Sequence, residues 1–277
     1  MRDMEQERQS LKQLIHFEKG AYSTKASKVS LLARLFPGLV FYSNTAWIVF
    51  WAGRAAKQGI YGNEEWAVSS YDIMTALEKV GVSIEISGID NFRSLNSPCV
   101  FIGNHMSALE TFILPCIIQP LTDTTFVVKE SLIDYPVFGP VIRSRNPVLV
   151  GRTNPREDLK AVLKGGTEIL SSGRSIVIFP QTTRTPVFNP SEFNTIGVKL
   201  AKKADVPVVP IALKTDAWGN GKRLKDFGKI DPSKKAYITF GKPLKIKDRG
   251  VEEHNAIISF IQEHLKKWGG ETATANR

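Results

Sequence analysis

Beyond Gly81, short runs of apolar residues alternate with segments whose apolar residues recur at helical spacing. The runs rich in Val, Ile and Phe predict strands over Ser83–Ile86, Cys99–Ile102, Thr125–Val128, Pro147–Val150, Ser175–Phe179, Val206–Ile211 and Ala236–Phe240. Between them the pattern predicts helices over Leu109–Ile118, Pro155–Ser171, Glu192–Lys203 and Val251–Trp268. Continuous apolar strands separated by helices are typical of a parallel sheet with both faces covered. We therefore predict a single-domain α/β fold, built on a largely parallel (mixed) sheet covered by helices.

Apolar and aromatic residues also fill the segment Leu35–Gly53, which has no formally charged side chain and is bracketed by Arg34 and Arg54. Pro37 is expected to interrupt any helix there, leaving Gly38–Gly53. At about 1.5 Å per residue this helix covers roughly 24 Å, less than a bilayer core of about 30 Å. Its Trp, Tyr and Phe side chains with flanking arginines are typical of an anchor at headgroup level. The pattern favours a monotopic membrane helix, with a transmembrane span or an ordinary buried helix as alternatives.

Three further segments complete the chain. The first 30 residues predict a polar helix and a Ser/Lys-rich link, and Glu64–Val80 predicts a packed helix. Residues 269–277 are small and polar, so we expect a flexible tail. This divides the chain into N-terminal helices with the membrane-associating segment (1–62), an α/β domain (63–268) and the tail. The charged start, MRDMEQERQSLKQL, lacks the apolar core of a secretory signal, and we expect no export.

The composition narrows the class of protein. With 277 residues, 42% of them hydrophobic and 23% charged, the chain can bury a sizeable core and is neither collagen-like nor a low-complexity disordered sequence. The two cysteines, Cys99 and Cys116, lie in apolar runs, where we expect buried thiols. Two cysteines are too few for a zinc finger or an iron–sulfur cluster, and no metal site is predicted.

The net charge of +10 is concentrated in one segment. Lys199–Arg249 contains 14 Lys and Arg but only 5 Asp and no Glu, an excess of nine positive charges. Such a face attracts nucleic acid, anionic lipid headgroups or a phosphate-bearing substrate, although a solvated lysine-rich surface has the same composition. Its basic residues are not interleaved with stacking aromatics and the chain shows no nucleic-acid-binding motif, so we do not expect nucleic acid as a partner.

A histidine and an acid follow the predicted strand Cys99–Ile102. In open α/β sheets, reacting groups gather beyond the carboxyl ends of the strands. His105 and Glu110 would be about 140° out of line on one regular helix, so they can meet only if His105 precedes the helix and folds back over its first turn. There the imidazole could act as a general base oriented by the carboxylate. Alternatively, Ser107 and Glu110 form an S-x-x-E capping box and His105 is structural.

Cations follow three further strands. Arg184 lies in the hydroxyl-rich segment Pro180–Thr185, where its planar guanidinium could bind a phosphate or simply be exposed to solvent. Lys129 and Arg152 also directly follow strands. One histidine and three cations at the ends of four strands favour a common site for an anionic substrate.

The order of these residues resembles that of the glycerolipid acyltransferases of the 1-acylglycerol-3-phosphate (lysophosphatidic acid) acyltransferase type. Five blocks correspond in order: N-H-x-x-x-x-D at Asn104–Glu110, K-x-x-L…P-x-x-G at Lys129–Gly139, a loose match to G-x-x-x-x-x-R that ends at Arg152, F-P-E-G-T-R-S at Phe179–Thr185, and V-P-[IV]-x-P at Val206–Pro210. The chain has Glu110 where the family has Asp, Gln181 where it has Glu, and Thr182 where it has Gly. A β-branched residue tolerates positive φ poorly, so Thr182 implies a different conformation of that loop.

The resemblance implies an O-acyltransferase that moves a fatty acyl group from acyl-CoA or acyl-carrier protein to the hydroxyl of 1-acylglycerol-3-phosphate, giving phosphatidic acid. In this interpretation His105 is the base and Glu110 orients it. The residues implied to bind the acceptor are Arg184, Lys129, Arg152, Gln181, Thr182 and Thr183.

The resemblance also implies an enzyme with no metal or cofactor beyond its acyl donor, bound to membrane lipid at the cytoplasmic face. The departures at Gln181 and Thr182 leave two alternatives, since both lie beside the implied phosphate site. One is an acyltransferase for another lysolipid acceptor, and the other is a non-catalytic lipid-binding relative.

Overall fold

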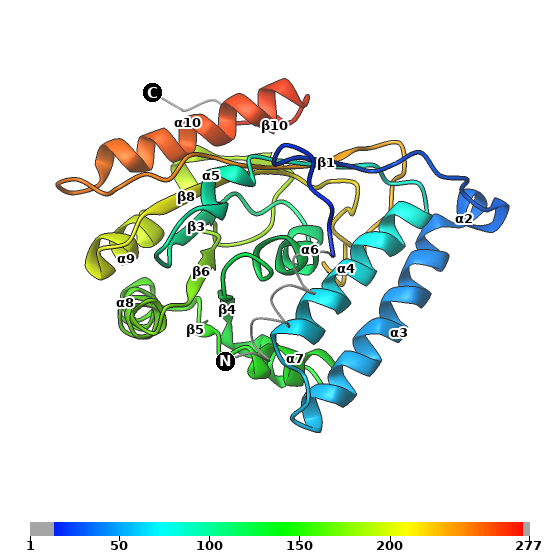
Figure 1. The fold of residues 1–277 in the computed structure, drawn as a ribbon, viewed down its shortest axis with the longest axis horizontal. Coiled ribbons are helices and arrows are strands. Elements are labelled where there is room, and N and C mark those ends of the chain that lie inside the picture. Colours follow the sequence, from blue (N-terminus) through cyan, green and yellow to red (C-terminus); the bar gives the residue numbers. More distant parts are fainter. Residues whose placement is uncertain (1–13, 274–277) are drawn as a thin grey trace.

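The computed structural model describes residues 14–273, in which an eight-stranded sheet lies between two layers of helices (Figure 1). Across the sheet the strand order is β1-β2-β9-β8-β3-β6-β4-β5. The strands are β1 (Tyr22–Ser23), β2 (Ile84–Ser87), β3 (Val100–Gly103), β4 (Thr124–Lys129), β5 (Val148–Val150), β6 (Ser175–Ile178), β8 (Val208–Lys214) and β9 (Ala236–Phe240).

Strands β8, β3, β6, β4 and β5 are neighbours that all run in the same direction. Strand β9 is antiparallel to β8, and β1 is antiparallel to β2, so the predicted largely parallel, mixed sheet is confirmed. Because the five parallel strands share a direction, their carboxyl ends lie at one edge of the sheet. His105, Arg152 and Arg184 follow three of these strands, and Lys129 is the last residue of β4, so all four residues lie at or beyond that edge.

Two hydrophobic clusters, one on each face of the sheet, hold the helical layers. Side chains alternate between the two faces of a strand, so Phe101 of β3 joins one cluster while Val100 and Ile102 join the other. The first cluster packs α4 (Asn63–Lys79) and α6 (Leu109–Ile118) against the sheet, and the second packs α8 (Pro155–Ser171), α9 (Ile196–Ala204) and α10 (Val251–Lys267). Burial on both faces explains why β3 is continuously apolar.

Most boundaries lie close to the predicted ones, and α6 and α8 have the predicted bounds. Helix α9 begins at Ile196 instead of Glu192, because Pro190–Glu192 forms a short 3-10 helix, η2, and the side chain of Asn194 accepts the Ile196 N–H at 3.0 Å. The pattern did not predict the short elements α5 (Asp90–Arg93), η1 (Glu130–Asp134), α7 (Phe138–Ser144), β7 (Val187–Phe188) and β10 (Glu271–Thr272).

Two helices, α2 (Leu31–Leu35) and α3 (Pro37–Lys57), lie between β1 and α4 in the chain, and α3 lies alongside α4 (Figure 1). Pro37 is the first residue of α3, so it separates the helices as predicted, but α3 continues beyond Gly53. One face of α3 is buried through Phe41. The large apolar side chains exposed on these helices are Leu31, Leu32, Leu35, Leu39, Trp47, Phe50 and Trp51. None of the helices in residues 14–273 is both long enough and apolar enough to span a bilayer.

The structure corrects the predictions for the two ends of the domain. Residues 14–30 contain no helix; there, Tyr22 and Ser23 pair with β2. The rest of the predicted polar helix lies outside the described residues. The expected flexible tail begins with β10, which pairs in parallel with β7, and Ala273 N–H donates to the Phe188 carbonyl at 2.8 Å. Backbone hydrogen bonds order this segment without any large apolar side chain; residues 274–277 lie outside the described part.

Candidate active site

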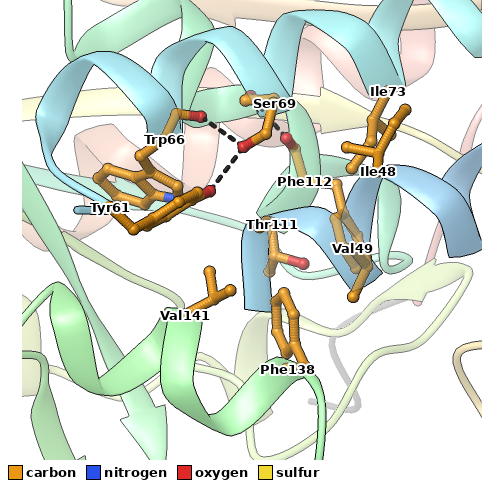
Figure 2. A pocket seen from close by; sticks show the side chains of 12 residues that line it. Ile48, Val49, Tyr61, Trp66, Ser69, Ile73, Thr111, Phe112, Phe138 and Val141 are labelled. Atoms are coloured by element: carbon orange, nitrogen blue, oxygen red, sulfur yellow. Dashed lines mark hydrogen bonds between the residues drawn. The ribbon is translucent and has the colours of Figure 1, made fainter. Parts of the chain in front are cut away.

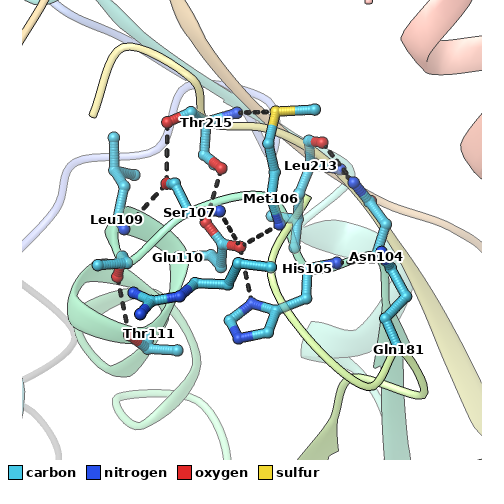
Figure 3. Close-up of polar contacts among 12 residues, drawn as sticks. Asn104, His105, Met106, Ser107, Leu109, Glu110, Thr111, Gln181, Leu213 and Thr215 are labelled. Carbon is cyan, nitrogen blue, oxygen red and sulfur yellow. Dashed lines mark hydrogen bonds and ion pairs between the residues drawn. The ribbon is translucent and has the colours of Figure 1, made fainter. Parts of the chain in front are cut away.

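Asn104 directly follows β3 and fixes the backbone from which His105 projects (Figure 3). Its side-chain amide donates to the Leu213 carbonyl at 2.7 Å, and its side-chain oxygen accepts the Leu213 N–H at 2.9 Å. This pair of bonds ties the end of β3 to β8 one residue beyond the last ladder pair, at Gly103. The chain then turns, and α6 begins at Leu109.

His105 folds back over the start of α6 and meets Glu110. His105 Nδ1 lies 2.9 Å from Glu110 Oε1, and Figure 3 shows the ring beside the carboxylate. The same oxygen accepts the N–H groups of Met106 at 2.6 Å and Ser107 at 2.8 Å. Glu110 is fully buried, whereas 11% of the His105 side chain is exposed. The pair meets in the geometry that the spacing required.

The second carboxylate oxygen of Glu110 is also saturated. Oε2 accepts the hydroxyl of Thr215 at 2.6 Å and that of Ser107 at 3.1 Å. Burial by itself raises the pKa of Glu110, but the contacts with His105 and the hydrogen bonds from Thr215 and Ser107 outweigh it and lower the pKa. Glu110 is therefore a buried, ionised carboxylate.

Glu110 also serves the start of α6. Its Oε1 accepts the Ser107 N–H, which is one of the two bonds of a capping box, whereas the Ser107 hydroxyl accepts the Leu109 N–H at 3.1 Å instead of the Glu110 N–H. The capping interpretation and the histidine-orienting interpretation describe the same carboxylate, so they are not alternatives.

The tautomer of His105 follows from this environment. An ionised carboxylate only accepts hydrogen bonds, so in the neutral imidazole Nδ1 carries the proton that faces Glu110 and the lone pair is on Nε2. The ring stacks on Phe179, with the ring centroids 4.5 Å apart and the planes 6° from parallel. Both contacts hold the imidazole in one orientation, and its Nε2 is available as a base.

The loop after β6 is bound to the histidine backbone on both sides. Gln181 Oε1 accepts the His105 N–H at 2.7 Å, and the His105 carbonyl accepts the Thr185 N–H at 3.0 Å. The amide oxygen of Gln181 thus makes a contact that a Glu carboxylate would also make. Among the described residues, Thr182 is not one of those with positive φ, so this loop needs no glycine.

The structure brings Arg184 and Arg152 into one cationic region beside this loop. Arg184 Nη1 lies 2.7 Å from Asp226 Oδ1, and Arg152 Nη1 donates to the Thr182 carbonyl at 2.8 Å. Burial is the main cause that lowers the pKa of Arg152; Asp158 opposes it, and the nearby charge of Arg184 adds to it. Two neighbouring guanidinium groups favour an anion between them.

The other predicted binding residues lie around this region. The Thr183 hydroxyl accepts the Lys225 ammonium at 2.6 Å. Lys129 is exposed at the end of β4 and pairs with Val150 of β5, next to Gly151 and Arg152. Seven of the eight predicted site residues therefore follow the carboxyl ends of β3, β5 and β6. The eighth, Lys129, is the last residue of β4.

Comparisons with known proteins show what this chain is similar to. Residues 83–214 match the sequence model of the Acyltransferase family. The matched residues include His105, Glu110, Lys129, Arg152 and Arg184. A 1-acyl-sn-glycerol-3-phosphate acyltransferase of Pseudomonas aeruginosa is 36% identical over 132 residues, which are 48% of this chain and 49% of that protein. A chloroplastic 1-acyl-sn-glycerol-3-phosphate acyltransferase of Brassica napus is 32% identical over 138 residues, 50% of this chain and 38% of that protein.

The alignments with these two relatives span about half or less of the relatives' length. A solved structure shares the fold over more of the chain: the crystal structure of the 1-acyl-sn-glycerophosphate (LPA) acyltransferase PlsC from Thermotoga maritima. It superposes with a TM-score of 0.67 over 88% of this chain and 99% of that chain, at 18% sequence identity. The match shows that most of this chain shares the fold of that structure.

Sequence reasoning missed the residues that the segment after β8 contributes to the site. Thr215 directly follows β8 and binds Glu110, and the segment after it supplies Asn220, Lys225 and Asp226. The Asn220 amide donates to the Met106 carbonyl at 2.8 Å. The available signal was the predicted strand over Val206–Ile211, which becomes β8. Because β8 is parallel to β3, it ends at the same edge of the sheet.

The basic residues of the segment Lys199–Arg249 do not all lie at one edge of the sheet. Strand β9 is antiparallel to β8, and after it Leu244 pairs with Val208 at the start of β8. Residues 242–249 therefore lie at the edge opposite His105, and in Figure 1 the orange connection into α10 lies across the molecule from α2 and α3. The interpretation of this segment as one face for headgroups or a phosphate-bearing substrate is therefore wrong for residues 242–249.

An apolar cavity lies between α3, α4, α6 and α7 (Figure 2). Thr111 and Phe112, which line it, directly follow Glu110 in α6. On the far wall the hydroxyls of Tyr61 and Ser69 are 2.6 Å apart. Its volume of about 30 Å³ is close to that of one water molecule in the liquid, so it does not hold an acyl chain as it stands.

Proposed function

We propose that this chain is a 1-acylglycerol-3-phosphate O-acyltransferase that transfers a fatty acyl group from acyl-CoA or acyl-carrier protein to lysophosphatidic acid, forming phosphatidic acid. The observation that carries the proposal is the contact between His105 Nδ1 and the buried Glu110 carboxylate at the carboxyl end of β3. It makes Nε2 a base at the edge of the sheet that also carries the two arginines. The names of the Pseudomonas and Brassica relatives support the same acceptor.

In the proposed reaction, Nε2 of His105 removes the proton of the acceptor hydroxyl as its oxygen attacks the thioester carbonyl. The new C–O bond forms, the C–S bond breaks, and the proton passes from the imidazolium to the leaving thiolate. Glu110 holds the ring and offsets the positive charge that develops on it. A positioned base of this kind accounts for about 10²–10⁴ in rate. The reaction needs neither a metal nor an acyl-enzyme.

The acceptor phosphate is proposed to bind at the cationic region, with Arg184 and Arg152 as its principal ligands and Lys129 beside them. Guanidinium groups bind phosphate through two parallel hydrogen bonds, which fixes the orientation of the acceptor as well as its position. Orientation matters here, because the hydroxyl must point at Nε2 of His105 to react. Gln181, Thr182 and Thr183 shape the loop that carries Arg184.

The enzyme is proposed to act at the membrane surface, on the cytoplasmic face. Helices α2 and α3 expose a set of large apolar side chains, with 73% of Leu31, 67% of Leu39 and 64% of Trp47 accessible. Apolar and Trp side chains on one helix face, with arginines nearby, favour a helix lying in the interfacial plane. A monotopic attachment brings the site to its lipid acceptor, which partitions into the same surface.

The test is acyl transfer by His105→Ala to lysophosphatidic acid in the presence of labelled acyl-CoA. We expect turnover to fall by about 10²–10⁴ while circular dichroism and vesicle binding stay unchanged. His16→Ala, at an exposed histidine far along the chain from the site, is the matched control and should turn over normally. Full activity of His105→Ala would reject the assignment.

Arg184→Ala separates the roles within the site. We expect a higher KM for lysophosphatidic acid with the KM for the acyl donor unchanged, because the guanidinium is assigned to the acceptor phosphate. An effect confined to the donor would contradict this assignment. A panel of headgroup-bearing lysolipids identifies the acceptor: better turnover of any of them than of lysophosphatidic acid would replace the proposed acceptor.

A further inference from the structure

Residues 219–229, called the 219–229 loop below, lie in the connection between β8 and β9 and contact residues of the site. Asp226 of this loop forms the ion pair with Arg184 at 2.7 Å, and Lys225 donates to the Thr183 hydroxyl. Asn220 donates to the carbonyl of Met106, the residue after His105. The loop thus touches both the catalytic turn and the cationic region.

The same loop packs on α3, the helix proposed above to lie at the membrane surface. The Tyr42 hydroxyl of α3 donates to the Gly228 carbonyl at 2.6 Å, and the Tyr42 ring lies 5.4 Å from that of Phe227. At the base of the loop, Trp218 donates its indole N–H to the Asp226 carbonyl at 3.0 Å and packs edge-on against Phe41 of α3. A displacement of the loop relative to α3 would therefore also move Asp226.

The outer side of the loop has the composition of a lipid-binding surface. Leu224 is 67% exposed and Phe227 is 64% exposed, although both are large and apolar. The loop carries four basic residues and one acidic residue, a net charge of +3, and its basic residues are Lys222, Arg223, Lys225 and Lys229. Apolar side chains that enter the interface between cations that bind headgroups are typical of attachment to anionic lipid.

The Arg184–Asp226 pair occupies the guanidinium that the proposed function assigns to the acceptor phosphate. Asp226 is 43% exposed, and ion pairs at exposed positions are weak because water screens them. A phosphate monoester carries up to two negative charges and can bind an arginine through two oxygens. It therefore binds Arg184 more strongly than the single carboxylate of Asp226 does.

We propose that the 219–229 loop is a latch operated by an anionic lipid surface. Away from a membrane, Asp226 holds Arg184; at the membrane, Leu224 and Phe227 enter the interface, the basic residues bind headgroups, and Asp226 leaves Arg184 free for the acceptor phosphate. This inference rests on the proposed function for the identity of the phosphate ligand and for the membrane contact of α2 and α3. It makes the loop a second membrane contact, beside α2 and α3.

The membrane contact is tested without turnover. Cys99 and Cys116 are buried, so a Leu224→Cys variant can be labelled selectively with an environment-sensitive fluorophore. With phosphatidylcholine vesicles containing about 30 mol% phosphatidylglycerol, we expect a blue-shifted, brighter emission, and a smaller change with phosphatidylcholine alone. Lys203→Cys, exposed at the end of α9 on the opposite edge, is the control and should not respond. An unchanged spectrum at position 224 overturns the latch.

The Asp226 contact is tested by Asp226→Asn, which keeps the size of the side chain and removes its charge. We expect the KM for a short-chain, water-soluble lysophosphatidic acid, and the dissociation constant for glycerol 3-phosphate, to fall about two- to fivefold. Asp231→Asn, at a carboxylate paired with Lys229, is the control and should change neither. If Asp226 merely oriented Arg184, both constants would rise instead, which overturns the latch.

The two proposals fail in different ways. A wild-type chain that turns over no lysolipid refutes the proposed function, yet the fluorescence experiment and the glycerol 3-phosphate titration still decide the latch. Normal turnover with no response at position 224, or with weaker phosphate binding in Asp226→Asn, refutes the latch and leaves the proposed function standing.

Discussion

Nδ1 of His105 lies 2.9 Å from Oε1 of Glu110, and that single oxygen also accepts two backbone N–H groups of the turn between them. The carboxylate therefore shapes the turn and orients the base at once. Any substitution of Glu110 therefore affects both the conformation of the turn and the orientation of His105. The two effects can be separated only by comparing different substitutions at this position.

Glu110→Gln should separate charge from shape. The amide keeps one acceptor oxygen but cannot offset the imidazolium, so we expect kcat to fall by about 10²–10⁴. Glu110→Asp, which carries the residue of the family motif, keeps the charge on a shorter side chain and should retain more activity than Glu110→Gln. Steady-state kinetics of both variants against wild type check this, and equal activities would show that the charge is not used.

The ionised state of Glu110 makes stability depend on pH. Because the pKa of Glu110 is lowered in the folded protein, its contribution is complete above the unfolded value, near 4.5, and is lost as the pH falls through the folded value. We expect the free energy of unfolding of wild type to fall more steeply than that of Glu110→Gln as the pH drops below about 4.5. Urea unfolding across pH 3–7 measures the difference, and identical slopes would contradict it.

Gln181 should tolerate the family's acid. Its Oε1 accepts the buried His105 N–H at 2.7 Å, a role that a carboxylate fills equally well, so Gln181→Glu should fold normally and retain activity. Gln181→Leu leaves that N–H without its partner and should cost about 1–3 kcal/mol of stability, with a lower kcat. Thermal unfolding and kinetics of the two variants provide the check. A Gln181→Leu protein as stable as wild type would show that this hydrogen bond is unimportant.

The two thiols should be inert in the folded protein. Burial raises the pKa of Cys99 and of Cys116 to about 12, so neither is a thiolate near neutral pH. We expect no reaction of the native protein with a thiol reagent at pH 8, and reaction of both thiols once urea unfolds the chain. Rapid labelling of the native protein would contradict the burial of these side chains.

Much of this fold follows from local patterns. The apolar runs of β3, β6 and β9 and the helical spacing of α6, α8 and α10 are properties of short stretches of chain, so their positions were predictable to within a few residues. The parallel arrangement was predictable too, because helices between continuous apolar strands require crossovers in one direction. For this reason the sequence also predicted that His105 and Arg184 start from one edge.

Which partners meet across that edge was decided by the tertiary structure. The contacts of Thr215 with Glu110 and of Asp226 with Arg184 join residues 105 and 42 positions apart in the chain. They depend on β8 lying next to β3, and no local pattern records that neighbourhood. Likewise, the direction of β9 sends residues 242–249 away from the site. Periodicity encodes each element because neighbouring residues determine it, whereas ion pairs between distant segments exist only once the sheet has brought those segments together.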